Sequence, residues 1–215
     1  PNRMPKRGKG GSDRARIALI HSLAHIEYMA IDLAFDAAGR FGGEFPREYM
    51  DDWMRVGAEE AMHFALLSRR LNNLGSEYGA LPAHAGLWEA AAETAHDAAA
   101  RLAIVPMVLE ARGLDVTPAT IDRAVAQGDE ATARILRRII DDEIFHVSVG
   151  TRWFEYCCFQ ARFDAHSHWK QLVERHFRGS LKPPFNDSAR RRAGLTQQYY
   201  LSVASRNPTH LSKPS

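Results

Sequence analysis

Cysteine is almost absent from this chain. Cys157 and Cys158 are the only two among 215 residues, and they are neighbours. A disulfide between adjacent cysteines would close a strained ring, so we expect free thiols in a reducing compartment, and hence a cytoplasmic protein. A domain built on a disulfide framework is excluded. Small residues on a helix are the favoured interpretation of the pair, and a vicinal redox pair is the alternative.

Long apolar runs and strand patterns are also missing. No continuous apolar run reaches the roughly 18 residues that cross a bilayer, and the basic, polar start lacks the apolar stretch of a signal peptide. We therefore expect no membrane association. No alternation of apolar and polar residues is bounded by turns, which argues against strands. The remaining pattern is helical, and the length suits one all-α domain.

An excess of charge of one sign is missing as well. The net charge is +2, and the basic stretches 3–16 and 190–192 are short. Either stretch could touch an anionic partner, but a solvated segment is the simpler explanation. The sequence therefore does not support a nucleic-acid partner.

Capping and turn residues divide the chain into long helices. Ser12 or Asp13 can cap the first helix, and Asp129 can cap the last long one. The irregular segment 76–86 fits a crossover between two helical hairpins, whereas the segment 113–118 is expected to interrupt the third helix. The predicted helices cover about 13–38, 46–74, 87–112, 118–128 and 129–163.

The helices imply a simple domain plan. A four-helix bundle is expected over residues 13–163, after a flexible basic arm over 1–12. A C-terminal helical extension over 164–204 is expected to pack on this bundle, and a disordered tail is expected over 205–215.

The most informative feature is a repeat of metal-ligand residue types. Each half of the chain supplies a lone glutamate followed by Glu-x-x-His, and the spacing from the lone glutamate to this motif is the same in both halves. One Glu-x-x-His is common on exposed helix faces, but two copies with equally spaced upstream glutamates favour ligands. The predicted metal ligands are Glu27, Glu60 and His63 in the first half, and Glu110, Glu143 and His146 at the matching positions of the second.

Helical geometry and charge support this interpretation. Residues three apart lie on one helix face, so each Glu-x-x-His can aim at one point. Two helices with Glu-x-x-His and two with a single glutamate form the ligand set of ferritin-like di-metal carboxylate bundles. Four buried carboxylates would repel one another, and two divalent cations would cancel their charge. We expect two transition-metal ions, with iron favoured and manganese or a mixed pair as alternatives.

Two acidic residues are candidates for supporting the ligands. Asp142 precedes Glu143 and Glu59 precedes Glu60, and either acid can accept the other N–H of a ligating imidazole. Solvated helix acids are the alternative for both. The offset between the halves also superposes Asp32 on Asp115 and Arg55 on Arg138. His21, His25 and His96 are excluded as ligands by their angle or distance along the helix.

A proline marks the third helix. Pro106 lies four residues before Glu110 and should kink the helix because it lacks an N–H. Small residues such as Ala103 and Gly150 would then leave room beside the metals for dioxygen or a substrate. A kink that only fits the helix into the bundle is an equally good explanation.

Six segments of the chain carry a likeness to a known family. They are HSLAHIEYMAIDLAFD from His21, AEEAMHFALLSRRL from Ala58, YGALPAHAGLWE from Tyr78, VPMVLEARGLDVTP from Val105, DDEIFHVSVGTRWF from Asp141 and PPFN from Pro183. They resemble a bacterial family of uncharacterised ferritin-like domains of unknown function. The likeness extends from about residue 17 to 195, and tRNA hydroxylases are a looser match. The resemblance implies a left-handed crossover bundle with a di-iron or mixed metal pair at the six positions above.

The expected function is an oxygen-activating oxidase or hydroxylase. Its partners would be dioxygen and an unknown small substrate, with an electron donor that the sequence does not identify. One alternative is a non-enzymatic metal-binding protein that scavenges iron or peroxide, and another is a bundle that uses metal only for stability. A homodimer is compatible with each interpretation.

Overall fold

The computed structural model of the protein describes residues 12–204, and this part of the chain is all-α. It contains no strand within those residues, only an isolated bridge between Leu181 and Ala204. Most of the expected arm and all of the expected tail lie outside the described residues. Ser12 is described, and it caps the first helix by accepting a hydrogen bond from the Ala15 N–H.

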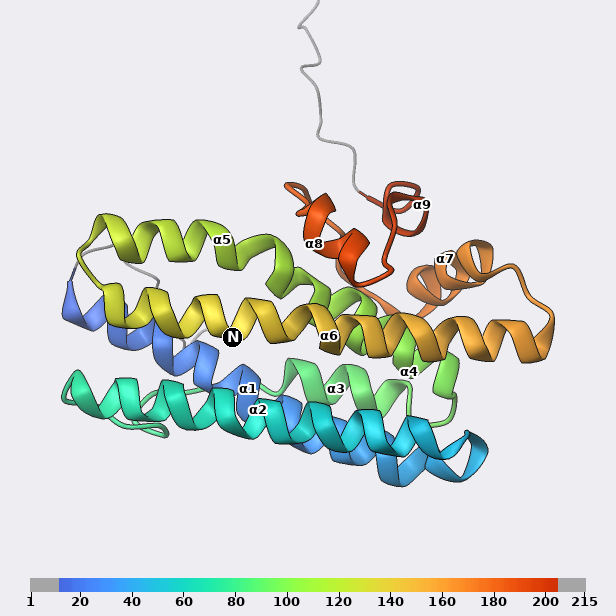
Figure 1. Cartoon of the computed structure of the whole chain (residues 1–215), viewed down its shortest axis with the longest axis horizontal. Coiled ribbons are helices and arrows are strands. Elements are labelled where there is room, and N and C mark those ends of the chain that lie inside the picture. Colours follow the sequence, from blue (N-terminus) through green and yellow to red (C-terminus); the bar gives the residue numbers. More distant parts are fainter. Residues whose placement is uncertain (1–11, 205–215) are drawn as a thin grey trace, which may run out of the picture.

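The first half of the chain forms an antiparallel helical hairpin. Helix α1 (Asp13–Phe41) is joined through the short 3-10 turn η1 (Gly42–Glu44) to α2 (Arg47–Asn73), and the two helices pack along their lengths (Figure 1). Helix α1 continues past the expected end at Ala38. The reason is that Gly42 keeps a helical backbone and bonds its N–H to the Ala38 carbonyl.

The second half contains five helical elements where fewer were expected. They are α3 (Gly86–Glu93), α4 (Ala98–Ile104), the π-helix η2 (Val105–Glu110), α5 (Ala111–Ala126) and α6 (Glu130–Ala161). The helix predicted over 87–112 is therefore wrong as one piece. Asp97 has an extended backbone and starts α4 by accepting a bond from the Ala100 N–H, which separates α4 from α3.

Pro106 produces a π-helical turn, where the sequence predicted a kink. Because Pro106 has no N–H, the helix widens, and the Ala111 N–H bonds to the Pro106 carbonyl five residues back. The neighbouring α6 meets this turn at Gly150. A Cβ added to Gly150 would lie 2.4 Å from the Cβ and Cγ atoms of Pro106. The proline ring thus fills the space expected to remain beside Gly150.

Pro118 does not interrupt α5, contrary to the expected break at 113–118. The carbonyl of Leu114, to which a residue at 118 would normally donate, accepts a hydrogen bond of 3.1 Å from Nδ2 of Asn186. Asp115 accepts a further bond of 2.9 Å from the Asn186 N–H. A distant segment therefore satisfies the backbone group that the proline leaves free.

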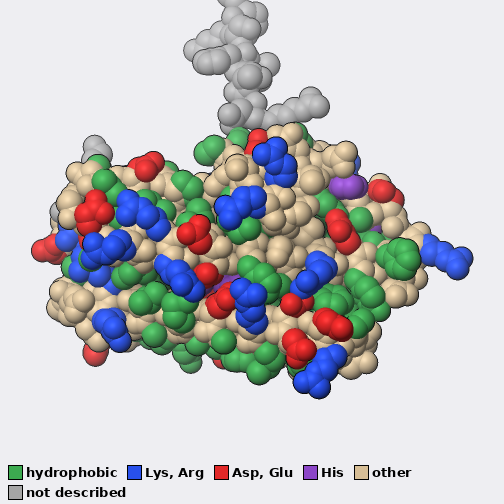
Figure 2. Space-filling view, in the orientation of Figure 1, with side chains coloured by type: hydrophobic (Ala, Val, Ile, Leu, Met, Phe, Trp, Pro, Cys, Tyr) green, Lys and Arg blue, Asp and Glu red, His purple; other side chains and the backbone are tan. Residues whose placement is uncertain are grey.

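The C-terminal segment forms three short helices on one side of the bundle. Helices α7 (Ala165–His176), α8 (Asp187–Arg192) and α9 (Gln197–Tyr200) lie against the α4, α5 and α6 side (Figure 1). Trp169 and Tyr200 are fully buried there. On the surface, basic and acidic side chains are interspersed on the face that Figure 2 shows.

By length and composition alone, the segment Asp13–Glu44 is apolar enough to cross a membrane. This differs from the expectation that no such stretch exists. In the most apolar 18-residue window of this segment, 39% is buried inside the protein. A core helix of a soluble protein passes the same test, so the segment is weak evidence for a membrane.

Candidate metal centre

Four helical elements bring the six predicted ligands close to one another. Helix α1 carries one glutamate, α2 and α6 each carry a glutamate and a histidine three residues apart, and η2 ends with a glutamate. In α2 and α6 the spacing of three places both side chains on the face that packs against the other helices. The positions are Glu27, Glu60, His63, Glu110, Glu143 and His146.

Four of these side chains form a compact group. Ligand atoms of Glu27, Glu60, His63 and Glu143 all lie within 4.8 Å of one another. The His63 Nδ1 is 3.4 Å from Oε2 of Glu27 and 3.4 Å from Oε2 of Glu60. This arrangement could hold a metal ion.

Glu60 lies between the two histidines. Its Oε2 faces His63, while its Oε1 is 2.9 Å from Nδ1 of His146. The His146 Nδ1 is also 3.6 Å from Oε1 of Glu143. The two imidazole centroids are 5.6 Å apart, so one carboxylate has an oxygen near each ring.

Glu110 lies beside this group without belonging to the compact four. Burial, followed by the charges of Glu143 and Glu60, raises the pKa of Glu110 to about 8. The π-helical turn places Glu110 at its last residue. Such turns are frequent at functional sites because they reorient a side chain relative to a regular helix.

Five buried polar atoms of these six side chains have no hydrogen-bond partner among the described residues. The 2.9 Å approach of His146 to Glu60 is short but lacks the direction of a hydrogen bond. Burying such atoms unpaired is costly, whereas a cation would coordinate them. The residues therefore fit a metal. The atoms are Glu60 Oε2, His63 Nδ1, Glu110 Oε2, Glu143 Oε2 and His146 Nδ1.

The electrostatics of the group describe a site that needs positive charge. Burial and the neighbouring Glu60 raise the pKa of Glu27. Burial opposes a charged His63, yet contacts with Glu27 and Glu60 raise its pKa to about 10. Burial likewise opposes a charged His146, but Glu143 and neighbouring acids raise its pKa. In a metal-free site, protons take the place of the missing cationic charge.

Each imidazole is held from behind by an acid on the opposite helix. Nε2 of His63 in α2 donates to Oδ2 of Asp142 in α6 at 3.1 Å. Nε2 of His146 in α6 donates to Oε2 of Glu59 in α2 at 2.9 Å. These bonds place a proton on Nε2, so Nδ1 is the atom that would bind a metal once the metal displaces its proton.

Two arginines complete this arrangement, and sequence reasoning did not assign their role. Nε of Arg55 donates to Glu59 at 2.9 Å, and Nε of Arg138 donates to Asp142 at 2.6 Å. The hydrogen bond from His146, together with Arg55, lowers the pKa of Glu59 to about 2. The signal in the sequence was the spacing of four residues to each acid, repeated at the offset that superposes Arg55 on Arg138.

Two of the excluded histidines, His21 and His25, hold the link between the hairpins. Nε2 of His21 accepts bonds from the N–H groups of Gly79 at 3.0 Å and Leu81 at 3.3 Å. His25 contacts the hydroxyl of Tyr78 at 2.9 Å and the carbonyl of His84 at 2.9 Å. Both rings therefore hold the segment between α2 and α3.

The repeated aspartates Asp32 and Asp115 do not have matching roles. Asp32 is exposed, whereas Asp115 is buried and binds Arg190 through bonds of 2.8 and 2.7 Å. Asp115 therefore anchors the C-terminal segment to α5. The positions that the repeat superposes near the cluster do have matching roles, since each arginine binds an acid that holds a histidine. Asp32 and Asp115 do not.

These observations define an all-α protein with a buried Glu/His cluster that could hold a metal. The chain belongs to the family described as "Protein of unknown function (DUF455)", whose model matches residues 1–201. It is 41% identical over 203 residues to an uncharacterized protein of Haemophilus influenzae, and the alignment covers 92% of this chain and 70% of that relative. No solved structure matches the chain. Membership of a family of unknown function agrees with that part of the resemblance seen in the sequence, and the ferritin-like part stays a prediction.

Proposed function

We propose that this protein is a di-metal carboxylate protein of the ferritin-like plan, with two transition-metal ions and iron as the favoured metal. We further propose that it activates dioxygen to oxidise or hydroxylate a small substrate. The observation that carries the proposal is the set of five buried ligand atoms without hydrogen-bond partners around Glu60. Two helical hairpins joined by the link before α3 support this plan, in which each hairpin would supply half of the ligands.

The ligands divide into two sides around the central carboxylates. Glu27 and His63 lie on one side, and Glu110 and His146 belong to the other. Glu60 has one oxygen near each imidazole, so it is suited to contact both ions. Two divalent cations would neutralise the four carboxylates, and the imidazoles would bind as neutral donors.

The six residues would hold the metal pair, which in its reduced form would supply electrons for the reduction of dioxygen. The chain itself positions and insulates this chemistry. Asp142 and Glu59 hold the imidazole protons away from the cluster, and each of these acids accepts a hydrogen bond from an arginine of its own helix. The ligands also lie on helix faces that are otherwise apolar and buried, such as the face of α2 that carries Leu67. These faces exclude bulk water.

The proposal is tested by metal analysis and oxygen uptake. Protein produced with added iron should contain about two iron ions per chain, and the reduced protein should consume dioxygen. Glu60→Ala should lose both properties, while Glu48→Ala, an exposed change on the same helix, should keep them. An empty site, or equal metal content in both variants, would contradict the proposal.

The same experiment separates the alternatives. Peroxide turnover without organic substrate, or many irons per chain, would identify a scavenging protein. Unfolding on chelation without oxygen uptake in the reduced protein would identify a metal that only stabilises the fold. Either result would overturn the proposed oxidase or hydroxylase activity while leaving the metal site in place.

A further inference from the structure

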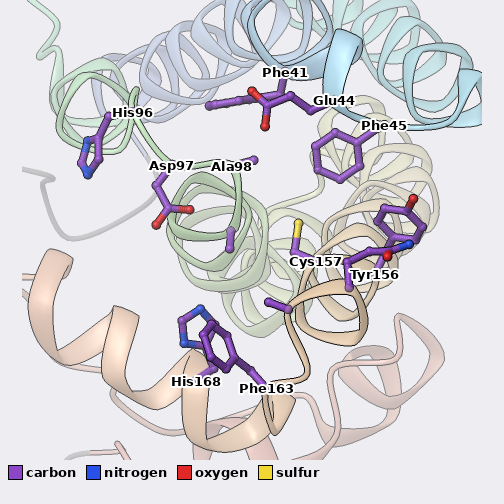
Figure 3. Close-up of a pocket in the computed structure, with 13 residues that line it drawn as sticks. Phe41, Glu44, Phe45, His96, Asp97, Ala98, Tyr156, Cys157, Phe163 and His168 are labelled. Atoms are coloured by element: carbon purple, nitrogen blue, oxygen red, sulfur yellow. The ribbon is translucent and has the colours of Figure 1, made fainter.

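A surface cavity of about 770 Å³ lies away from the Glu/His cluster (Figure 3). It is formed by the ends of α1 and α6, the turn η1, the start of α4 and one residue of α7. Almost four helical turns separate Phe41 in its wall from Glu27 on α1, and Tyr156 lies similarly far beyond Glu143 on α6. At about 1.5 Å per residue, the cavity lies roughly 20 Å from the cluster along the bundle. It is therefore a separate site.

Aromatic rings form much of the wall. Phe41, Phe45, Tyr156 and Phe163 line the cavity, and the rings of Phe45 and Tyr156 have centroids 5.7 Å apart. Phe41 is buried, while Phe45 and Tyr156 are half-buried. Rings held in this way offer both apolar contact and the negative faces that attract cations.

Two carboxylates face the same space from different elements. Glu44 ends η1 and has no ion-pair or hydrogen-bond partner among the described residues. Asp97 precedes α4; its Oδ1 accepts the Ala100 N–H at 3.1 Å, and it forms no ion pair within that same part of the chain. The described lining includes His96 and His168 but no lysine or arginine. Its fixed charges are therefore both negative.

The thiol of Cys157 lies in the wall of the cavity, where the charges of Asp97 and Glu44 act on it. Its sulfur lies in the wall between Ala98 and Tyr156 in the view of Figure 3. Burial is the main cause that raises the pKa of Cys157 to about 12, and Cys158, Asp97 and Glu44 add to it. The carboxylate field thus disfavours an anion at this position and favours a cation.

We propose that this cavity binds a small organic cation, an ammonium group carried on an apolar body. The apolar body would contact the aromatic wall, and the ammonium group would lie between Glu44 and Asp97. The volume is in the range of small-molecule sites, which combine apolar walls with a few polar groups that set specificity. The site takes a ligand whether or not the cluster holds metal.

The test compares three probes that share one apolar body. Binding of 2-phenylethylamine, 2-phenylethanol and phenylacetate to the full chain is measured by calorimetry at neutral pH. We expect the ammonium probe to bind at least tenfold more tightly than the alcohol, with phenylacetate the weakest. Equal binding of the three probes, or no binding of the amine at millimolar concentration, would overturn the proposal.

Matched variants locate the site. Glu44→Gln and Asp97→Asn should each weaken the amine at least fivefold and leave the alcohol unchanged, and asparagine retains the cap of α4. Glu89→Gln removes the same charge from exposed α3 and should change nothing. Chemical shifts of the Ala98 and Cys157 amides should move on titration. Unchanged affinity in both pocket variants, or shifts confined to other helices, would contradict the site. Metal content should be the same in all variants, which separates this result from the metal centre.

Discussion

Asp142 accepts a hydrogen bond from the imidazole of His63, although the two residues are 79 positions apart and lie on different helices. The pairing crosses the bundle, since Glu59 of α2 holds His146 of α6 in return. Each Glu-x-x-His motif thus places a glutamate and a histidine in the cluster, and the acid before each motif holds the histidine of the other. A substitution of one supporting acid should therefore change the position and proton affinity of the histidine on the opposite helix.

The first prediction concerns this support. Asp142→Asn should weaken metal binding about 10- to 100-fold, because a neutral amide accepts the hydrogen bond from Nε2 of His63 less strongly than a carboxylate does. Competition with a chromophoric chelator measures the affinity. Asp141→Asn is the control, since its exposed side chain is adjacent in sequence. Equal metal retention in the two variants would show that the acid is only a solvated helix residue.

The second prediction concerns pH and the metal-free protein. The folded-state pKa values of Glu110, about 8, and His63, about 10, lie above their ordinary values of 4.5 and 6.5. The folded state therefore binds more protons than the unfolded state between each pair of values. Each group's contribution to stability is lost as pH rises through that window, with a slope of about 1.4 kcal/mol per pH unit per proton.

Denaturant unfolding in the presence of chelator measures this trend. Stability of the metal-free protein should fall from about pH 5 to pH 8, and Glu110→Gln should reduce the fall by removing one titrating group. Added metal should stabilise the protein more at pH 8 than at pH 5, because metal displaces the protons. Metal-free stability that rises with pH across this range would contradict the assignment.

The third prediction concerns the contact between Gly150 and Pro106. Gly150→Ala should destabilise the protein by about 1–3 kcal/mol, because the added methyl overlaps the proline ring and α6 must move. Gly113→Ala is the control, since a Cβ there meets no atom within 4 Å. Urea unfolding of the metal-loaded proteins gives the difference. A fully tolerated Gly150→Ala would mean that the π-turn adjusts at no cost.

The fourth prediction concerns the anchor of the C-terminal segment. Arg190 and Asp115 are both buried and form two hydrogen bonds. Arg190→Met should cost about 3–5 kcal/mol, because it leaves a buried carboxylate without its charged partner. Arg191→Met changes an exposed neighbour and should cost far less. Similar unfolding midpoints for the two variants would refute a structural role for the pair.

Much of the helical fold could be predicted because its signals are local. The Asp129 cap begins α6, and the Ser12 cap begins α1, as side-chain bonds to the next turn require. The same local reasoning failed at Pro118. The proline removes one backbone donor, and only the distant Asn186 supplies the replacement. Nothing in the sequence near Pro118 indicates that partner.

The sequence by itself determined which residues gather near the bundle centre, because helical spacing decides which side chains share a face. Repetition of Glu-x-x-His at one offset was enough to nominate His63 and His146. Only the tertiary structure decided that each imidazole is held by the acid of the opposite helix, and that Glu60 lies between the two rings. The physical reason is that spacing along one helix specifies direction, whereas contacts between helices depend on how whole helices pack. The cavity between α1, α4, α6 and α7 likewise exists only once those helices meet.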